Sequence, residues 1–302
     1  MKNLKKVLVG LDLTLMDEIL IKKTIDIVQL LEIEKVYFVH VAKDLTISEE
    51  VTKAYPDLPA PVDEAIEKKI TNSVIHAGFP EGVDFEVEAK EGNPLETILR
   101  WSKVKNVDIL IMGRKHENKG SGSLAKRIAH KSPCSVLFFT EGIANQKFAN
   151  LMIPIDFSSY SLLSLEFAQE IVKEPKSIKC FHLYEVPSGY SKIGKSYEEF
   201  SEIMLNNAKE DYQEFIKKNN LPQFDCKFIL RKDDNKAESL IDIAAKEGIN
   251  FIIIGSRGRT DSASMLVGSV AEKLIDINNG IPMLILKKKG ETMHFLEALF
   301  KV

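Results

Sequence analysis

The sequence predicts an α/β protein of two tandem doubly wound domains, each containing a five-stranded parallel sheet. At 302 residues the chain is longer than most single domains. Short apolar runs alternate with segments of helical period along its whole length, which is typical of parallel sheets covered by helices. The pattern repeats at a near-constant offset, since Asp12 and Asp156 are 144 residues apart and Gly113 and Gly255 are 142 apart. We therefore predict a tandem duplication.

Each domain is expected to alternate five strands with four helices. The first, 1–142, has predicted strands at 7–12, 36–41, 83–89, 107–113 and 134–139 and helices at 16–31, 62–76, 94–104 and 123–130. The second, 149–289, has predicted strands at 151–156, 178–186, 224–230, 251–254 and 282–287 and helices at 159–172, 197–218, 236–247 and 268–277. Right-handed crossovers would then cover both faces of each sheet.

Local signals support individual elements. Asn93 is suited to cap the helix at 94–104, and Pro94 fits its first turn. In the tail, 290–302, apolar residues recur at helical spacing, which predicts a short amphipathic helix docked on the body of the protein. Binding of this tail to a membrane or a partner is the alternative, although it is too short to anchor alone.

The composition favours a soluble protein of a reducing cytoplasm. The net charge is −3 and the pI is about 6.1, without a basic stripe of the kind that binds nucleic acid. Cys134, Cys180 and Cys226 are widely spaced and odd in number, so we expect free thiols. Neither a signal peptide nor an apolar run of membrane-spanning length is recognisable, and we expect no membrane association.

The most informative stretch, 251–270, reads as a strand, a glycine-rich loop and the start of a helix. Gly255, Gly258 and the pair Gly268-Ser269 give the spacing G-x-x-G-x9-G-S. Glycine permits positive φ and close approach of a ligand, while a helix starting near Gly268 would point free N–H groups into the loop. Such a loop suits phosphate, yet it is neither a Walker A loop nor G-x-G-x-x-G.

Other residues of the second domain lie at strand ends, where open α/β sheets bind ligands. Asp156 closes the first strand, two residues after Pro154, and either caps the next helix or binds a ligand. Leu183 and Tyr184 lie near the end of the second strand, where a backbone N–H and C=O could pair with the edge of a base.

Together these residues resemble the universal stress protein family, whose nucleotide-binding members carry G-x-x-G-x9-G-[ST] after the fourth strand. The motif is complete here, and IPIDFS at 153–158 resembles the family's first strand and its acidic end. Both domains fit the family's strand order, which implies an adenine nucleotide alpha hydrolase-like, Rossmann-like fold. The resemblance also implies that the fifth strands pair within the chain as a pseudo-dimer, and it leaves a homodimer open.

The resemblance implies ATP, ADP or AMP in the second domain, with Asp156 on the adenosine portion and the glycine loop around the phosphates. Whether Mg²⁺ accompanies the phosphates is open, and Arg257 and Arg259 are either phosphate ligands or solvated charges. The expected nucleotide-binding residues are Pro154, Asp156, Leu183, Tyr184, Ile254, Gly255, Arg257, Gly258, Gly268, Ser269 and Val270.

The first domain departs from the motif. His116 stands where the second glycine belongs, and only eight residues separate Gly113 from Gly122. A loop so shortened should not wrap a triphosphate in the same way, so we expect a degenerate partner domain. Its basic residues Arg114, Lys115 and Lys119 either attract an anion or form a solvated turn.

The expected function is a stress-response sensor or regulator controlled by bound adenine nucleotide. We identify no catalytic motif and no metal-ligand spacing, so at most slow ATP hydrolysis is expected. Two alternatives remain: a weak ATPase or nucleotide-using transferase, and an interaction module in which neither domain binds nucleotide. The protein partner is not predictable.

Overall fold

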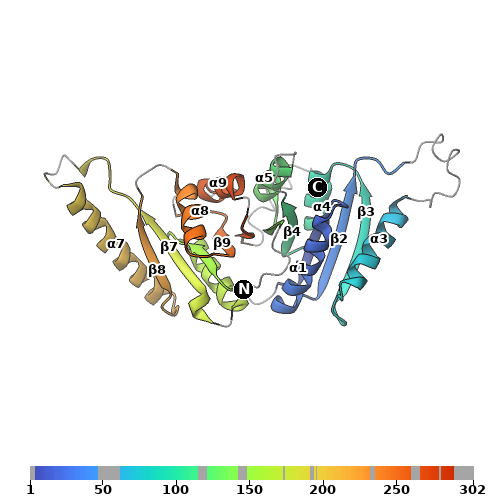
Figure 1. The fold of residues 1–302 in the computed structure, drawn as a ribbon, viewed down its shortest axis with the longest axis horizontal. Coiled ribbons are helices and arrows are strands. Elements are labelled where there is room, and N and C mark those ends of the chain that lie inside the picture. The colour runs from blue at the N-terminus through green and yellow to red at the C-terminus, as the bar shows by residue number, and fades with distance from the viewer. Residues whose placement is uncertain are drawn as a thin grey trace. The chain divides into compact units, whose positions relative to one another are not determined.

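The computed structural model describes residues 4–46, 62–114, 121–141, 148–172, 174–190, 194, 196–231, 235–259, 266–278 and 280–288. These residues form two compact units, each described by itself below (Figure 1). The N-terminal unit extends to 141 and also includes 287–288, and the C-terminal unit covers 148–286. Among the described residues, no helix has the length and apolarity needed to cross a bilayer.

The N-terminal unit is a parallel sheet of five strands in the order β3-β2-β1-β4-β5. Its helices form two contacting pairs, α1 with α3 and α4 with α5, as expected when right-handed crossovers cover both faces of a sheet. Its elements are β1 (Lys6–Leu11), α1 (Met16–Leu31), β2 (Lys35–Ala42), α3 (Val62–His76), β3 (Asp84–Glu91), α4 (Pro94–Val104), β4 (Ile109–Arg114), α5 (Ser121–Lys131) and β5 (Ser135–Thr140).

The C-terminal unit repeats this topology, with strand order β8-β7-β6-β9-β10 and parallel pairing throughout. In each unit the order reverses beside the first strand, between β1 and β4 and between β6 and β9. Its elements are β6 (Leu151–Pro154), α6 (Ser159–Ile171), the 3-10 helix η1 (Pro175–Ser177), β7 (Ile178–Tyr184), α7 (Tyr197–Lys218), β8 (Asp225–Leu230), α8 (Lys236–Lys246), β9 (Phe251–Gly255), α9 (Ser269–Ile277) and β10 (Met283–Leu286).

The predicted elements and the observed ones agree within a few residues at their ends. The helices at 62–76, 94–104 and 197–218 have the predicted bounds, and the Asn93 side chain caps α4 by accepting the N–H groups of Leu95 and Glu96. The three cysteines are free, as expected. The predicted tail helix lies outside the described residues.

The central strands supply the core of each unit. Val7, Leu8 and Val9 of β1 are fully buried, and so are Leu151, Met152 and Ile153 of β6. Continuous apolar runs of this kind are typical of strands that are covered on both faces, which is why they could be recognised in the sequence.

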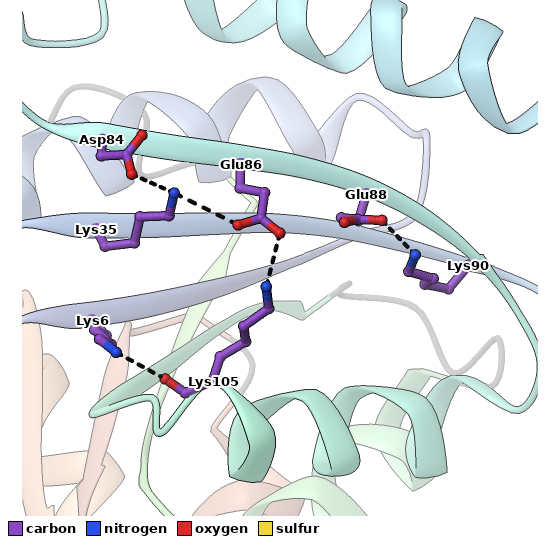
Figure 2. A network of polar contacts seen from close by, with 7 residues as sticks. All are labelled: Lys6, Lys35, Asp84, Glu86, Glu88, Lys90 and Lys105. Carbon is purple, nitrogen blue, oxygen red and sulfur yellow. Dashed lines mark hydrogen bonds and ion pairs between the residues drawn. The ribbon is translucent and has the colours of Figure 1, made fainter.

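The edge strand β3 carries a network of charged side chains (Figure 2). Glu86 accepts a hydrogen bond from Lys105 at 2.9 Å, at the end of α4, and Lys35 of β2 forms ion pairs with Asp84 and Glu86. These contacts tie helix, edge strand and inner strand together. A charged edge also discourages pairing with strands of other chains.

Candidate functional site

A cavity of about 270 Å³ lies at the carboxyl ends of β6, β7 and β9, where the strand order of the C-terminal unit reverses. This is the position at which open α/β sheets bind ligands. Its lining residues are Pro154, Ile155, Asp156, Ser161, Phe181, His182, Leu183, Lys236, Leu240, Ile254, Gly255, Ser256, Arg257, Gly258, Arg259, Gly268, Ser269, Val270 and Ala271. The cavity therefore brings together ten of the eleven residues predicted from the sequence. The exception is Tyr184.

Asp156 is held in the cavity wall by several hydrogen bonds. Its Oδ1 accepts the hydroxyl of Ser161 at 2.7 Å and the N–H of Ser158 at 3.1 Å, and its Oδ2 accepts the N–H of Arg259. Burial alone would raise the pKa of Asp156, but hydrogen bonds from the serine hydroxyls and from the backbone outweigh burial and lower this pKa below its ordinary value. The carboxylate is therefore a fixed anionic acceptor.

Asp156 does not cap the following helix, which was the structural alternative for this residue. The N-cap of α6 is Ser158, whose hydroxyl accepts the N–H groups of Tyr160 and Ser161. The cavity instead uses the aspartate as part of its wall.

The residue after Asp156 has an unusual backbone conformation. Phe157 has φ of +64°, which is rare for a bulky side chain and costs energy. Its ring stacks on the imidazole of His182 with centroids 4.4 Å apart, and it also contacts Phe215 of α7. Such strained residues cluster at ligand clamps, so the turn is evidence for a site that was not available from the sequence.

His182 fixes the chain segment that leads to Asp156. Its Nδ1 lies 2.9 Å from the carbonyl oxygen of Ile155. Burial lowers the pKa of His182, and the nearby ammonium of Lys236 lowers it further, against the opposing effects of this hydrogen bond and of Asp156 and Asp211. The imidazole is consequently neutral near pH 7, and its Nδ1–H donates to Ile155.

Two glycines of the predicted phosphate loop, Gly255 and Gly268, do not use the positive φ that glycine permits. Gly268 is the N-cap of α9 with φ of −74°, and its N–H donates to the carbonyl of Ser256 at 2.6 Å. A Cβ on Gly255 would lie 2.5 Å from Cβ of Tyr160, so only glycine lets α6 pack there. The middle of the loop, 260–265, lies outside the described residues.

Helix α9 contributes the side of the cavity best suited to an anion. Gly268, Ser269 and Val270 all line the cavity, and the last two begin the helix. The first N–H groups of a helix have no partner within that helix, and the helix dipole adds positive potential. This combination of N–H groups and dipole binds phosphate in many proteins.

Three basic side chains line the same cavity, namely Lys236, Arg257 and Arg259. Lys236 occupies the first turn of α8, where the helix dipole disfavours a cation. The guanidinium of Arg259 lies 3.7 Å from the carboxylate of Asp211, and both side chains are largely exposed. Together with Asp156, these residues give the described lining a net positive charge.

The end of β7 distinguishes the two residues that were predicted there. The carbonyl of Phe181 accepts the N–H of Ile155, beyond β6, and the carbonyl of Tyr184 accepts the N–H of Arg231, beyond β8. Since backbone groups of a strand alternate in direction, those of Leu183 point to the side that β6 has left. Leu183 therefore lines the cavity, whereas the backbone carbonyl of Tyr184 faces β8. A role for Tyr184 in binding stays a prediction of the sequence.

Sequence reasoning missed His182, Lys236 and Ser161. The repeat could have revealed His182, because His40 stands 142 residues earlier in the first domain. It could also have shown Lys236, which stands where the first domain has Pro94. Ser161 had no signal, because its role depends on the turn that follows β6. Among the described residues, no group of three or more His, Cys, Asp or Glu side chains is arranged to hold a metal ion.

Fold and cavity define a class of protein: a duplicated, doubly wound α/β protein with a polar cavity at the switch point of its sheet. The model of the universal stress protein family matches residues 3–139 and 147–285. The chain belongs to this family, with two tandem family domains.

Three relatives and solved structures illustrate how similar individual proteins are to this chain. "Universal stress protein MJ0577" of Methanocaldococcus jannaschii is 26% identical over 158 residues, which are 47% of this chain and 97% of that protein. A solved universal stress protein from Archaeoglobus fulgidus covers 96% of this chain and 98% of its own, at 16% identity and a TM-score of 0.60. The functionally unknown protein PA1789 from Pseudomonas aeruginosa covers 100% and 99%, at 15% identity and a TM-score of 0.64. These two structures support the fold alone.

Proposed function

We propose that the C-terminal unit binds an adenine nucleotide, with ATP as the first candidate, and that the bound nucleotide regulates a stress response. The observation that carries this proposal is the pairing, in one cavity, of the Asp156 carboxylate with the N-terminus of α9. A carboxylate accepts hydroxyl groups such as those of ribose, and a helix N-terminus accepts phosphate.

In this proposal each wall of the cavity has a role. Asp156 accepts the ribose hydroxyls, and the backbone of Leu183 pairs with the edge of the base. The N–H groups of Ser269 and Val270, at the start of α9, bind the phosphates next to Gly268, with Mg²⁺ as an optional companion. Pro154, Ile254, Gly255 and Gly258 shape the cavity, and the cations Arg257 and Lys236 add positive potential.

Regulation by binding is favoured over rapid catalysis. The described lining residues include the imidazole of His182, but burial lowers its pKa and its Nδ1 is engaged by Ile155. A slow ATPase is the second candidate, and a module that works only through protein contacts is the third. The cytoplasmic location, the pairing of the fifth strands within one chain and a homodimer stay predictions of the sequence.

The test is to identify what the purified protein carries and what stabilises it. Nucleotide released by denaturation would be identified by chromatography, and binding of ATP, ADP and AMP would be measured by calorimetry. Asp156→Asn should weaken binding roughly 10- to 100-fold, because it removes a charged hydrogen-bond acceptor. Asp12→Asn, at the matching position of the other unit, should leave nucleotide affinity unchanged.

Gly268→Val places a branched side chain at the N-cap of α9 and should abolish binding. Gly280→Val is the matched control, because a Cβ on Gly280 has no atom within 4 Å. If the wild-type protein carries no nucleotide and its melting temperature does not change with millimolar ATP, the proposal fails. ATP turnover above that of Gly268→Val would instead favour the slow ATPase.

A further inference from the structure

Two of the three cysteines of the chain lie side by side in the C-terminal unit. Cys180 of β7 and Cys226 of β8 are register partners on neighbouring parallel strands, and both are free thiols. Residues opposite each other on neighbouring strands point their side chains to the same face of the sheet. The two thiols are therefore neighbours, although they are far apart in the sequence.

The residues around the pair show which face of the sheet this is. His182 and Phe228, the register partners two positions further along each strand, have ring centroids 6.1 Å apart. Phe228 also contacts Tyr212 of α7, at a centroid distance of 5.9 Å. Because side chains two residues apart on a strand share a face, both cysteines lie on the face that α7 covers (Figure 1).

The pair is buried at one end and accessible at the other. Cys180 is fully buried, whereas Cys226 is partly exposed on the edge strand β8. Burial raises the pKa of Cys180 well above its ordinary value, and the nearby Cys226 and Asp225 raise it further. Burial, with a contribution from Asp225, also raises the pKa of Cys226, to about 12. Both thiols therefore stay protonated near pH 7 and react slowly with oxidants, while the edge strand gives a small ion access to them.

The spacing of the strands favours a bridging ion over a disulfide. Neighbouring strands lie about 4.8 Å apart, whereas the β carbons of a relaxed disulfide are about 3.8 Å apart. A direct bond would thus have to draw the two strands together by roughly 1 Å. One metal ion with two opposite bonds to sulfur of about 2.3 Å would hold the sulfur atoms roughly 4.6 Å apart, which fits the sheet as it stands.

The ligand set selects the ion. Cysteine sulfur is a soft ligand that favours Cu(I), Zn(II) and iron–sulfur clusters. Zinc sites and iron–sulfur clusters use four protein ligands, and the described residues contain no group of three or more His, Cys, Asp or Glu arranged around one ion. The hydroxyl of Tyr212 is engaged by both backbone groups of Phe224. Cu(I), with its filled d shell, is stable with two sulfur ligands in line.

We propose that Cys180 and Cys226 form a two-sulfur binding site for Cu(I). Binding breaks the two S–H bonds, forms two Cu–S bonds and releases two protons to water, with no change of oxidation state. The ion joins the inner strand β7 to the edge strand β8. Since a ligand stabilises the state that binds it, Cu(I) should raise the melting temperature of the C-terminal unit.

The test is a titration of the full-length, reduced chain with Cu(I) in the absence of oxygen, in competition with a chromophoric Cu(I) chelator. The wild-type protein should take up one ion per chain, and Zn(II) should not displace it. X-ray absorption at the copper edge should show two sulfur neighbours.

Three variants make the test specific. Cys226→Ala changes a partly exposed side chain and is the principal variant, and Cys180→Ala removes the other ligand. Because loss of an outer-shell partner alone costs roughly 10- to 100-fold in metal affinity, loss of one of two ligands should cost at least about 100-fold. Cys134→Ala is the matched control. It removes the buried cysteine of the other unit, whose sulfur contacts Ser132, and should leave the affinity unchanged.

Uptake of no ion, or an affinity that Cys226→Ala leaves unchanged, would overturn the inference. Weaker binding in Cys134→Ala would also overturn it, and so would nitrogen or oxygen neighbours at the copper edge. An unchanged melting temperature of metal-free Cys226→Ala would show that its loss of affinity is not a loss of fold. These outcomes are independent of the proposed function, because none of the described residues that line the nucleotide cavity is a cysteine.

Discussion

The cavity at the carboxyl ends of β6, β7 and β9 and a second cavity at those of β1, β2 and β4 have nearly the same volume, about 270 and 260 Å³, and described linings of opposite net charge. Both have an aspartate, a left-handed residue and a hydroxyl residue in sequence, and both have a histidine that holds the end of the first strand. The described lining of one cavity has three cations, whereas that of the other has none. The comparison teaches that backbone geometry survived the duplication, while the charged side chains of the described lining diverged.

The charges of the two units also differ away from the cavities, at the ion pairs that link the end of a helix to the sheet. In the N-terminal unit Lys105 follows α4 and pairs with Glu86 of β3 (Figure 2). At the corresponding place in the C-terminal unit, Glu247 follows α8 and pairs with Lys179 of β7 and Lys227 of β8. The charges are reversed but the link persists, which indicates that the pairing matters more than its polarity.

The largest effect should come from the glycine that separates each fourth strand from the first helix of its unit. A Cβ at Gly255 would meet the Cβ and backbone of Tyr160 at 2.5 and 3.3 Å, whereas at Gly113 it would meet Cγ of Met16 at 2.6 Å. Because methionine can move and a backbone cannot, Gly255→Ala should cost about 3 kcal/mol and Gly113→Ala about 1 kcal/mol. Urea unfolding without ligand measures both, and equal costs would contradict this distinction.

Leu13 and Phe157, which both have positive φ, should change stability in opposite directions when each is replaced by asparagine. Asparagine tolerates this conformation better than other side chains, so Leu13→Asn should stabilise the N-terminal unit by about 0.5 kcal/mol. Phe157→Asn relieves the same strain but removes the stacking on His182 and the contact with Phe215, and should cost about 2 kcal/mol. Trp101, the single tryptophan, reports unfolding of the N-terminal unit by fluorescence.

For these variants, methionine methyl resonances of the C-terminal unit report the unfolding that Trp101 does not detect. If Leu13→Asn and Phe157→Asn changed stability in the same direction and by the same amount, the two turns would have equivalent roles. In that case the aromatic stack would add nothing to the C-terminal site.

A smaller effect on the free energy of unfolding is expected from the ion pairs whose charges are reversed between the units. Lys105→Glu places two carboxylates together and should cost about 1 kcal/mol, since the pair is partly exposed and the positive charge at the helix end is lost. Adding Glu86→Lys should restore part of the lost stability, and the resulting pair would have the charges of Glu247 and Lys227 in the C-terminal unit. A double-mutant cycle followed by Trp101 fluorescence measures the coupling, and a coupling of zero would reduce the network to solvated charges.

The fold was predictable because its signals are local. Continuous apolar strands, the Asn93 cap and the near-constant offset between the halves each depend on a few neighbouring residues, and they gave every described strand and α-helix within a few residues of its end. The cavity was predictable where glycines and an aspartate follow strands. The sequence could not show that the carbonyl of Tyr184 faces β8, because the direction of a backbone carbonyl depends on strand register.

The rest of the site depends on contacts between distant segments. The hydrogen bond from the Arg259 N–H to Asp156 joins residues 103 positions apart, and the ring of Phe157, whose φ is +64°, stacks on His182, 25 positions further along the chain. Comparing the two halves of the sequence position by position would have recovered His182 and Lys236. Such a comparison finds what is shared or replaced, but not how a turn is held.

The smallest effect concerns stability at acidic pH. One carboxylate in each unit should change the pH dependence of stability, and the two changes should have opposite signs. The pKa of Asp156 is lowered, because its hydrogen bonds outweigh burial; the pKa of Asp17 in the N-terminal unit is raised, because burial outweighs the hydrogen bonds from Asp12 and Leu13. Asp156 therefore contributes stability that is present above its unfolded value, about 3.9, and is lost as the pH falls through its lowered folded value.

For Asp17 the linkage is reversed. Its contribution is fully present below the unfolded pKa and is lost as the pH rises through the raised folded value. Asp156→Asn should flatten the loss of stability of the C-terminal unit at low pH, whereas Asp17→Asn should steepen the corresponding loss in the N-terminal unit. Unfolding measured at intervals between about pH 2 and 6 by Trp101 fluorescence and methionine resonances tests both signs. Slopes that change in the same direction in both variants would show that the two carboxylates are held alike, and the electrostatic contrast between the units would then be confined to the cations of the C-terminal cavity.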